Sequence, residues 1–231
     1  MKKKLIITLI AAIAIFSDGF AQNCDKFIYM TNGKVIKYSA TDAKGKKLTK
    51  MTYTVKSKMG NKAIVQSEII DGKDKPISKA EVEMICDGNN LKLDMRSFIP
   101  GAGLSGFKNM TVKADVSYLT YPSKLQTGQK LEDGVFNMQM FRETQKMADM
   151  SFKMLNRTVE ATENVTTPAG TYDCYKITYN IEMKTTAMGF SIPMNIKITE
   201  WYSAKLGLFV KSNSFDKNGK PMGSTLLESI N

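Results

Sequence analysis

The sequence contains no histidine, and this absence closes several kinds of chemistry. Ser-His-Asp and Cys-His catalytic arrangements, histidine general bases and imidazole metal sites all need that side chain. A zinc site without histidine would need four thiolates or a carboxylate-rich set, and the chain has only three cysteines, Cys24, Cys86 and Cys174. We therefore expect neither a metal nor a cofactor, and most hydrolase mechanisms are excluded.

Arginine is also scarce, although the chain is basic. Arg96, Arg142 and Arg157 are its three arginines, and the formal net charge is +11. Scattered lysines behave as hydrated point charges, whereas specific phosphate recognition favours guanidinium groups. Without an arginine cluster or a basic stripe on a helix, nucleic-acid binding is not expected. Net charge alone suffices for a weak attraction to an anionic envelope surface.

Long apolar runs are missing beyond the first segment of the chain. Residues 5–16, LIITLIAAIAIF, follow three lysines, and GFA at 19–21 supplies the small residues of a signal-peptidase site. The pattern predicts a signal peptide over 1–21 and a single domain over 22–231. The apolar run is shorter than the roughly 20 residues that span a bilayer, so no transmembrane segment is expected. Asn23 precedes Cys24 where a lipoprotein signal needs a small residue, so a lipid anchor is not expected.

Alternation with period two is the dominant pattern of the domain. It is clear in MTYTVKSK (51–58), LKLDMR (91–96) and AEVEMIC (80–86), where Val82, Met84 and Cys86 face inward. Residues 141–155 permit a short helix, but a hairpin joining strands at 134–142 and 151–160 is preferred. The sequence predicts an all-β, antiparallel fold of roughly ten or more strands in a strongly curved or closed barrel-like sheet, with at most one short helix.

Two further motifs suggest chemistry but fit structural roles better. GAGLSG at 101–106 matches the dinucleotide fingerprint without its strand and helix context, which favours a loop over the sheet. Glu81 and Glu83 share a strand face opposite the core residues, so both are expected to face water rather than to form a catalytic pair. Asp71 and Asp216 are expected to be turn residues. A carboxylate-dependent, glycosidase-like enzyme is the third functional alternative.

Three cysteines in an exported chain predict one disulfide and one spare thiol, with three pairings open. Cys24–Cys86 is the first choice because it would tie the N-terminus to a core-facing strand position. Cys174 would then be unpaired. Its only neighbouring cation along the strand is Lys176, so a structural cysteine is expected rather than a nucleophile.

Methionine is abundant, with sixteen in the chain. Met138 and Met140 lie two apart and would share one strand face, where thioethers could in principle ligate Cu(I). Methionine is also an adaptable filler of irregular cores, and this explanation is preferred. A methionine-rich interior further suits a pocket for a lipid or another apolar ligand.

Several motifs together resemble a known family. They are YPSKLQTGQKLEDGVF (121–136), VTTPAGTYDCYKITYN (165–180) and EWYSAKLGLFVKSN (200–213). They are similar to the TapB-like family of exported bacterial β-proteins, which is related to the domain-of-unknown-function 3108-like group. The resemblance implies a barrel-like β domain in the periplasm or on the cell surface of a Gram-negative bacterium, in a family without an assigned activity.

Two functional hypotheses follow, from different classes. The first is a non-enzymatic binding protein that holds an apolar ligand or an envelope protein segment against Tyr175, Tyr179, Trp201, Phe209, Met138 and Met140. This hypothesis assumes that Tyr175 and Tyr179 lie on the same face of one strand. The alternative is a structural or interaction module of the envelope with a filled core, which predicts no cavity of ligand size.

Overall fold

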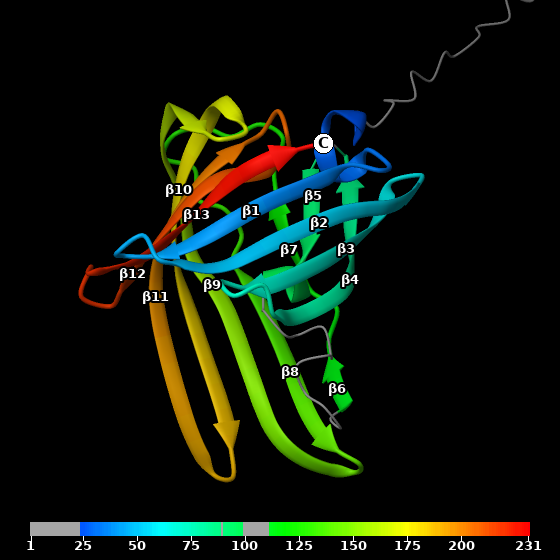
Figure 1. The fold of residues 1–231 in the computed structure, drawn as a ribbon, viewed down its shortest axis with the longest axis vertical. Helices are drawn as coiled ribbons and strands as arrows, with labels where there is room; N and C mark the ends of the chain where they lie inside the picture. Colours follow the sequence, from blue (N-terminus) through cyan, green and yellow to red (C-terminus); the bar gives the residue numbers. More distant parts are fainter. Residues whose placement is uncertain (1–23, 89, 99–110) are drawn as a thin grey trace, which may run out of the picture.

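The computed structural model describes residues 24–88, 90–98 and 111–231. The predicted signal peptide and the GAGLSG segment lie outside the described residues. These residues contain thirteen strands (Figure 1): β1 Val35–Asp42, β2 Lys47–Met59, β3 Lys62–Asp71, β4 Pro76–Asp87, β5 Asn90–Asp94, β6 Thr111–Ala114, β7 Tyr118–Tyr121, β8 Gly134–Arg142, β9 Gln145–Thr167, β10 Gly170–Ala187, β11 Phe190–Ser203, β12 Leu208–Asp216 and β13 Pro221–Ile230. Short 3-10 helices span η1 Cys24–Lys26, η2 Ile28–Met30 and η3 Met95–Phe98.

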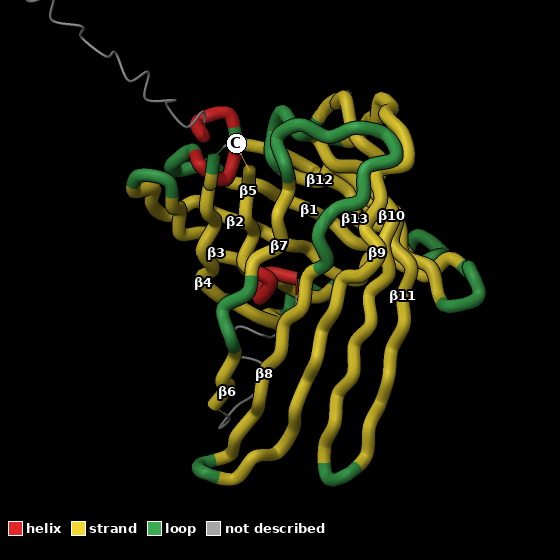
Figure 2. Tube along the Cα trace, turned by 180° about the vertical axis from the view of Figure 1, so that it is seen from behind, coloured by secondary structure: helices red, strands yellow, loops and turns green. Residues whose placement is uncertain are grey.

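All thirteen strands belong to one antiparallel sheet, in the order β6-β8-β9-β10-β11-β12-β13-β1-β2-β3-β4-β5-β7. The all-β antiparallel prediction is thus confirmed. The predicted closed barrel is not confirmed, because the strand order leaves β6 and β7 as the two edges of the sheet. The reason is the connection between them, since residues 115–117 join β6 to β7 almost end to end (Figure 2). Among the described residues, β6 pairs only with β8, and β7 pairs only with β5.

The predicted alternation appears directly in the burial of the strands. In β8, Gly134, Phe136, Met138 and Met140 are buried, and the residues between them are exposed. Val82, Met84 and Cys86 are likewise buried in β4, as predicted. Residues 141–155 form the β8–β9 hairpin rather than a helix, with Arg142 opposite Gln145. The second strand begins six residues earlier than the sequence pattern had indicated.

Three hairpin tips share one turn chemistry. In each, an aspartate Oδ1 accepts hydrogen bonds of 2.8 and 2.9 Å from two backbone N–H groups of the turn. The residues are Asp42, Asp71 and Asp216, and each tip also carries lysines. The backbone hydrogen bonds lower the pKa of Asp71 and of Asp216, because they stabilise the ionised form. The structure therefore gives Asp71 and Asp216 the predicted turn role.

The core lies where two parts of the sheet face each other. Strands β1–β4 cross the direction of the long strands β8–β11 (Figure 1). Tyr121 of β7 stacks on Tyr202 of β11 with ring centroids 4.4 Å apart, and Tyr38 of β1 stacks on Phe209 of β12 at 4.6 Å. These pairs join strands that are not neighbours in the sheet, so the sheet bends around a shared interior.

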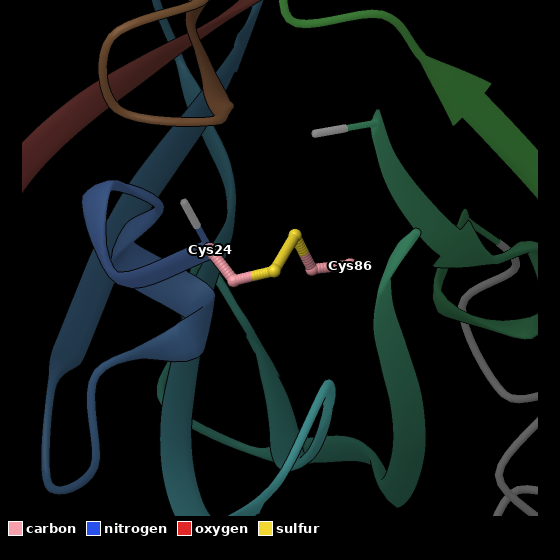
Figure 3. The surroundings of a disulfide bond; sticks show 2 residues. All are labelled: Cys24 and Cys86. Atoms are coloured by element: carbon pink, nitrogen blue, oxygen red, sulfur yellow. A yellow bond between two sulfur atoms is a disulfide. The ribbon is translucent and has the colours of Figure 1, made fainter. Parts of the chain in front are cut away.

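A disulfide between Cys24 and Cys86 fastens the N-terminal segment to this core (Figure 3). The two Cα atoms are 5.7 Å apart, and both cysteines are buried. The structure thus contains the first of the three pairings left open by the sequence. None of the helices in the described part of the chain is long and apolar enough to cross a membrane.

Candidate functional site

A cavity of about 260 Å³ lies inside the bend of the sheet. Its walls come from β2, β3 and β4 on one side and from β10, β11 and β12 on the other. Most of its lining is aromatic or aliphatic: Tyr29, Met51, Tyr53, Ile69, Met84, Leu93, Phe98, Tyr121, Tyr179, Ile181, Ile198, Tyr202, Leu208 and Phe209. Ser97, Ser212, Thr225 and Glu200 add the polar groups. An apolar cleft with a few converging polar groups is the usual form of a small-molecule site.

Glu200 is the one acid among the described residues that line this cavity. Its side chain is buried, with 2% of the residue exposed. Its two carboxylate oxygens accept hydrogen bonds of 2.9 Å from the hydroxyls of Tyr121 and Tyr179. Burial raises the pKa of Glu200, because the charged form is less well solvated there; the nearby Arg157 charge and the two tyrosine bonds act in the opposite direction.

Arg157 provides a positive charge near Glu200 and its two tyrosine partners. It is 1% exposed, and its guanidinium carbon lies 4.6 Å from the centre of the Tyr121 ring. Nη1 donates hydrogen bonds to the backbone carbonyls of Thr120, at 3.2 Å, and Glu132, at 2.8 Å. Arg157 therefore ties β9 to β7 and to the segment before β8 while it balances the charge of Glu200.

Two polar groups in this cluster have unused hydrogen-bonding capacity. Within the described part of the chain, the Tyr202 hydroxyl and the Nε and Nη2 atoms of Arg157 are buried without a hydrogen-bond partner. An unpaired buried donor costs free energy, typically about 1–3 kcal/mol. Tyr202 also lines the cavity, so this unpaired hydroxyl belongs to a residue of the cavity wall.

The structure brings together two of the six predicted ligand-binding residues. Tyr179 and Phe209 both line the cavity. Met138 and Met140 are buried in β8 and are absent from the described lining. Tyr175 and Trp201 are half-buried and also lie elsewhere.

The separation of Tyr175 from Tyr179 has a structural cause. Cys174, Ile177 and Tyr179 are all buried along β10, so burial does not follow a single alternating face. The pairing of β10 with β9 shifts register between Lys176 and Ile177 and again between Thr178 and Asn180. These β-bulges change the local twist, and simple alternation cannot place residues on both sides of them.

Trp201 is held by polar contacts instead. Its indole N–H donates to the Glu163 carboxylate, and the Lys211 ammonium lies 4.7 Å from the centre of its ring. Lys211 belongs to the neighbouring strand β12, and Glu163 belongs to β9, on the far side of β10. Trp201 thus belongs to a polar contact across the sheet rather than to the cavity.

Glu200 and Arg157 are the site residues that the sequence reasoning missed. For Glu200 a signal was present, since Ile196, Ile198 and Glu200 alternate in NIKITEW, which places the glutamate on the isoleucine face. For Arg157 no simple signal existed. Asn156 has a φ of 57°, and two residues of β9 stand opposite Tyr179 at the bulge, so the alternation from Phe152 and Met154 is broken just before the arginine.

Cys174 is the remaining thiol, and it is buried. Burial raises the pKa of the Cys174 thiol to about 12, and Asp173 and Glu163 add to the effect by charge repulsion. The thiol is therefore protonated at neutral pH, as befits a structural cysteine. We expect a thiol reagent such as DTNB to leave Cys174 unmodified in the native protein and to titrate one thiol after unfolding in urea. Fast reaction of the native protein would contradict this.

Comparison with known proteins adds the family. A family model described as DUF3108-like matches residues 31–227. The chain belongs to the DUF3108-like family. The relationship indicated by the sequence motifs is thereby confirmed, although the comparisons do not use the TapB name. No curated protein matches the chain.

Two solved structures share the fold of this DUF3108-like chain. One is of a candidate lipoprotein from Parabacteroides distasonis, with a TM-score of 0.70, 21% identity and coverage of 89% of this chain and 98% of that one. The other is of a candidate exported protein with a YmcC-like fold from Bacteroides fragilis, with a TM-score of 0.66, 18% identity and coverage of 87% and 96%. At these identities the likeness concerns the fold alone. In the present chain Cys24 is joined to Cys86 by a disulfide.

Proposed function

We propose that this protein is a non-enzymatic binding protein of the cell envelope, which holds one small apolar ligand in the cavity beside Glu200. The cavity itself carries the proposal, because a module with a filled core would have no such space. The expected signal peptide, the disulfide and the likeness to a candidate exported protein and a candidate lipoprotein support an envelope location.

The size of the cavity limits the ligand. Its 260 Å³ exceed the roughly 150 Å³ of an engineered cavity that binds benzene, and lie just below the range of roughly 300–1,000 Å³ of drug-sized sites. A single acyl chain or a small ring system fits this volume better than a whole two-chain lipid. The apolar walls supply the affinity, and Glu200 with its tyrosines supplies the polar end.

Binding accounts for the site better than catalysis does. A paired-carboxylate glycosidase needs two acids roughly 5–10 Å apart, and Glu200 is the one acid in the described lining. Glu83 lies outside this cavity, where it accepts hydrogen bonds from Tyr118, at 2.7 Å, and from Lys62. Those contacts lower the pKa of Glu83, so it is ionised at neutral pH and unsuited to act as a general acid.

The test uses the neutral fluorescent probe N-phenyl-1-naphthylamine, whose emission rises in apolar surroundings. We expect the wild-type protein to bind the probe, and Ile198→Trp to weaken binding by about tenfold or more, because the larger side chain fills the cavity. Ile64→Trp is the matched control, because Ile64 is half-buried on β3 and absent from the described lining. The affinity of this variant for the probe should stay within about twofold of the wild-type value.

Equal binding by the Ile198→Trp and Ile64→Trp variants would place the probe outside the cavity and contradict the proposal. No probe binding by the wild type would contradict it as well. Native mass spectrometry of the protein purified from its own cells supplies the second readout. A bound small molecule that is lost in Ile198→Trp supports the proposal, and a ligand-free wild type counts against it.

A further inference from the structure

The end of the β10–β11 hairpin exposes a set of large apolar side chains. Their exposed fractions are 81% for Met188, 78% for Phe190, 69% for Ile192 and 46% for Met194. We call these four residues the hairpin patch. The hairpin reaches away from β1–β4 and ends at a free tip (Figures 1 and 2). Isolated exposed apolar residues are ordinary on protein surfaces, but a contiguous set of this kind marks an interaction site.

The hairpin patch is the outer end of a stripe that continues into the cavity. Directly paired residues of two strands share one face of a sheet. From the tip inward these pairs are Ala187 with Phe190, Thr185 with Ile192, Met183 with Met194, Ile181 with Ile196 and Tyr179 with Ile198. Tyr179, Ile181 and Ile198 line the cavity. One apolar face therefore runs from solvent to the ligand site.

The turn at the tip departs from the chemistry of the three aspartate tips. Met188 and Gly189 have φ values of 50° and 81°, the positive values that a two-residue type I′ turn requires. Asparagine or aspartate favours the first of these positions, and methionine is strained there. The tips at Asp42, Asp71 and Asp216 use aspartate and lysine, which solvent favours. Glu143 also has a positive φ, of 54°, at the β8–β9 tip. Unlike that glutamate, Met188 also exposes an apolar side chain to solvent, which indicates a role outside the turn itself.

We propose that the hairpin patch docks this protein on the surface of an anionic lipid bilayer, with Met188 and Phe190 inserted at the depth of the headgroups. Aromatic and long apolar side chains on a protruding tip suit shallow insertion of this kind. Charge agrees with an anionic surface, because the chain has 33 basic against 22 acidic residues and most of this excess lies outside the expected signal peptide. Lys184 and Lys197 are exposed on the same hairpin and outnumber the exposed Glu182.

The edge of the hairpin argues against a partner strand as the occupant. β11 pairs with β12 only from Ile196 onward, so residues 190–195 form an edge strand beyond the body of the sheet. Pro193 lies in this edge and has no backbone N–H to offer. Proline on an edge strand blocks the continuous ladder that strand addition needs. A lipid surface requires no such ladder.

Docking at this tip would give the cavity an apolar approach from the membrane. A single-chain molecule could then move along the apolar stripe from Phe190 to Tyr179. This route rests on the proposed ligand-binding function, whereas the docking itself does not. The two are tested separately, by vesicle binding and by probe binding.

The experiment measures flotation of the purified processed protein with vesicles of phosphatidylcholine, alone or mixed with phosphatidylglycerol. We expect the wild type to bind the mixed vesicles, more weakly as salt is added. The variant Met188→Asn, Phe190→Ser, Ile192→Thr should reduce the partition coefficient by about tenfold or more, because it removes the inserted apolar surface and leaves the charge unchanged.

Met59→Asn is the matched control. Met59 also precedes a glycine at a hairpin turn and is 75% exposed, but it belongs to the β2–β3 tip. The Met59→Asn variant should bind vesicles as the wild type does.

Urea unfolding and binding of N-phenyl-1-naphthylamine should be unchanged in the triple variant, which would show that its fold and cavity are intact. If the variant bound vesicles as the wild type does, or if the wild type did not bind the mixed vesicles, docking on lipid would be wrong. Self-association of the wild type without vesicle binding, abolished in the triple variant, would instead assign the patch to a second copy and overturn the proposal.

Discussion

Replacing Arg157 with methionine is expected to lower the free energy of unfolding by about 3 kcal/mol or more, since removal of one member of a buried charged set leaves the other uncompensated. Methionine keeps much of the buried volume, so the loss reports the charge and the hydrogen bonds rather than a large cavity. The bonds lost are those to the carbonyls of Thr120 and Glu132. Urea denaturation, followed by the fluorescence of the single tryptophan, Trp201, measures the change.

A double-mutant cycle with Glu200→Gln separates the charge pairing from simple packing. If Arg157 compensates Glu200, the combined variant loses less stability than the sum of the two single variants, by about 1 kcal/mol or more. Additive losses would show that the two side chains contribute independently. The Tyr121 and Tyr179 hydroxyls remain present throughout the cycle and can still bond the amide of glutamine.

The dependence of stability on pH provides an independent check of the same pair. Burial raises the pKa of Glu200 in the folded state above its ordinary value of 4.5, so the ionised carboxylate destabilises the fold. The stability that Glu200 contributes relative to glutamine is fully present below the unfolded pKa and is lost as the pH rises through the folded pKa. In Arg157→Met the nearby cation is gone, so the recovery of stability on acidification should begin at a higher pH. The Arg157→Met, Glu200→Gln variant should lack this component.

The second large effect is expected from the disulfide. Cys24 and Cys86 are 62 residues apart, and the chain-entropy model assigns about 4 kcal/mol to a cross-link of that span. Cys24→Ala, Cys86→Ala should therefore unfold at a markedly lower urea concentration. Alanine is chosen because both sites are buried and a serine hydroxyl would need a partner there.

Cys174→Ala is the control for the disulfide experiment, because it changes a buried cysteine without cutting the cross-link. Its loss should be smaller than that of the double variant. Treatment with dithiothreitol should shift the urea midpoint of the wild type and of Cys174→Ala equally, and should not affect the variant without the disulfide. A loss below about 1 kcal/mol in the double variant would show that the N-terminal segment gains little from being fastened to β4.

Most of the strands could be predicted because their burial repeats every two residues. Val82, Met84 and Cys86 are an example, and Phe136, Met138 and Met140 are another. The turn aspartates could also be predicted, since their hydrogen bonds lie within four residues of the same chain segment. The β8–β9 hairpin required a choice between two local patterns, and the β-branched residues near Val159 indicated the correct one.

The candidate site was predictable only in part, because its residues meet across the bend of the sheet. Tyr179 and Phe209 were predicted from their aromatic character and lie at the cavity. Tyr175 was separated from Tyr179 by the irregular pairing with β9, and Met138 and Met140 were correctly placed on the inner face of β8 but away from the described lining. Glu200 could have been found from its alternation with Ile196 and Ile198, whereas the bulge at Asn156 concealed Arg157.

The sequence alone determined the class of fold, the positions of most strands and turns, and the chemistry that the absence of histidine excludes. All of these depend on residue type and on spacing along one segment. Only the tertiary structure decided that the sheet stays open between β6 and β7, that Cys24 meets Cys86, and that Glu200 and Arg157 share one buried cluster. The physical reason is that strand pairing partners, bulges and the bend of the sheet arise from contacts between distant segments, which local alternation does not encode.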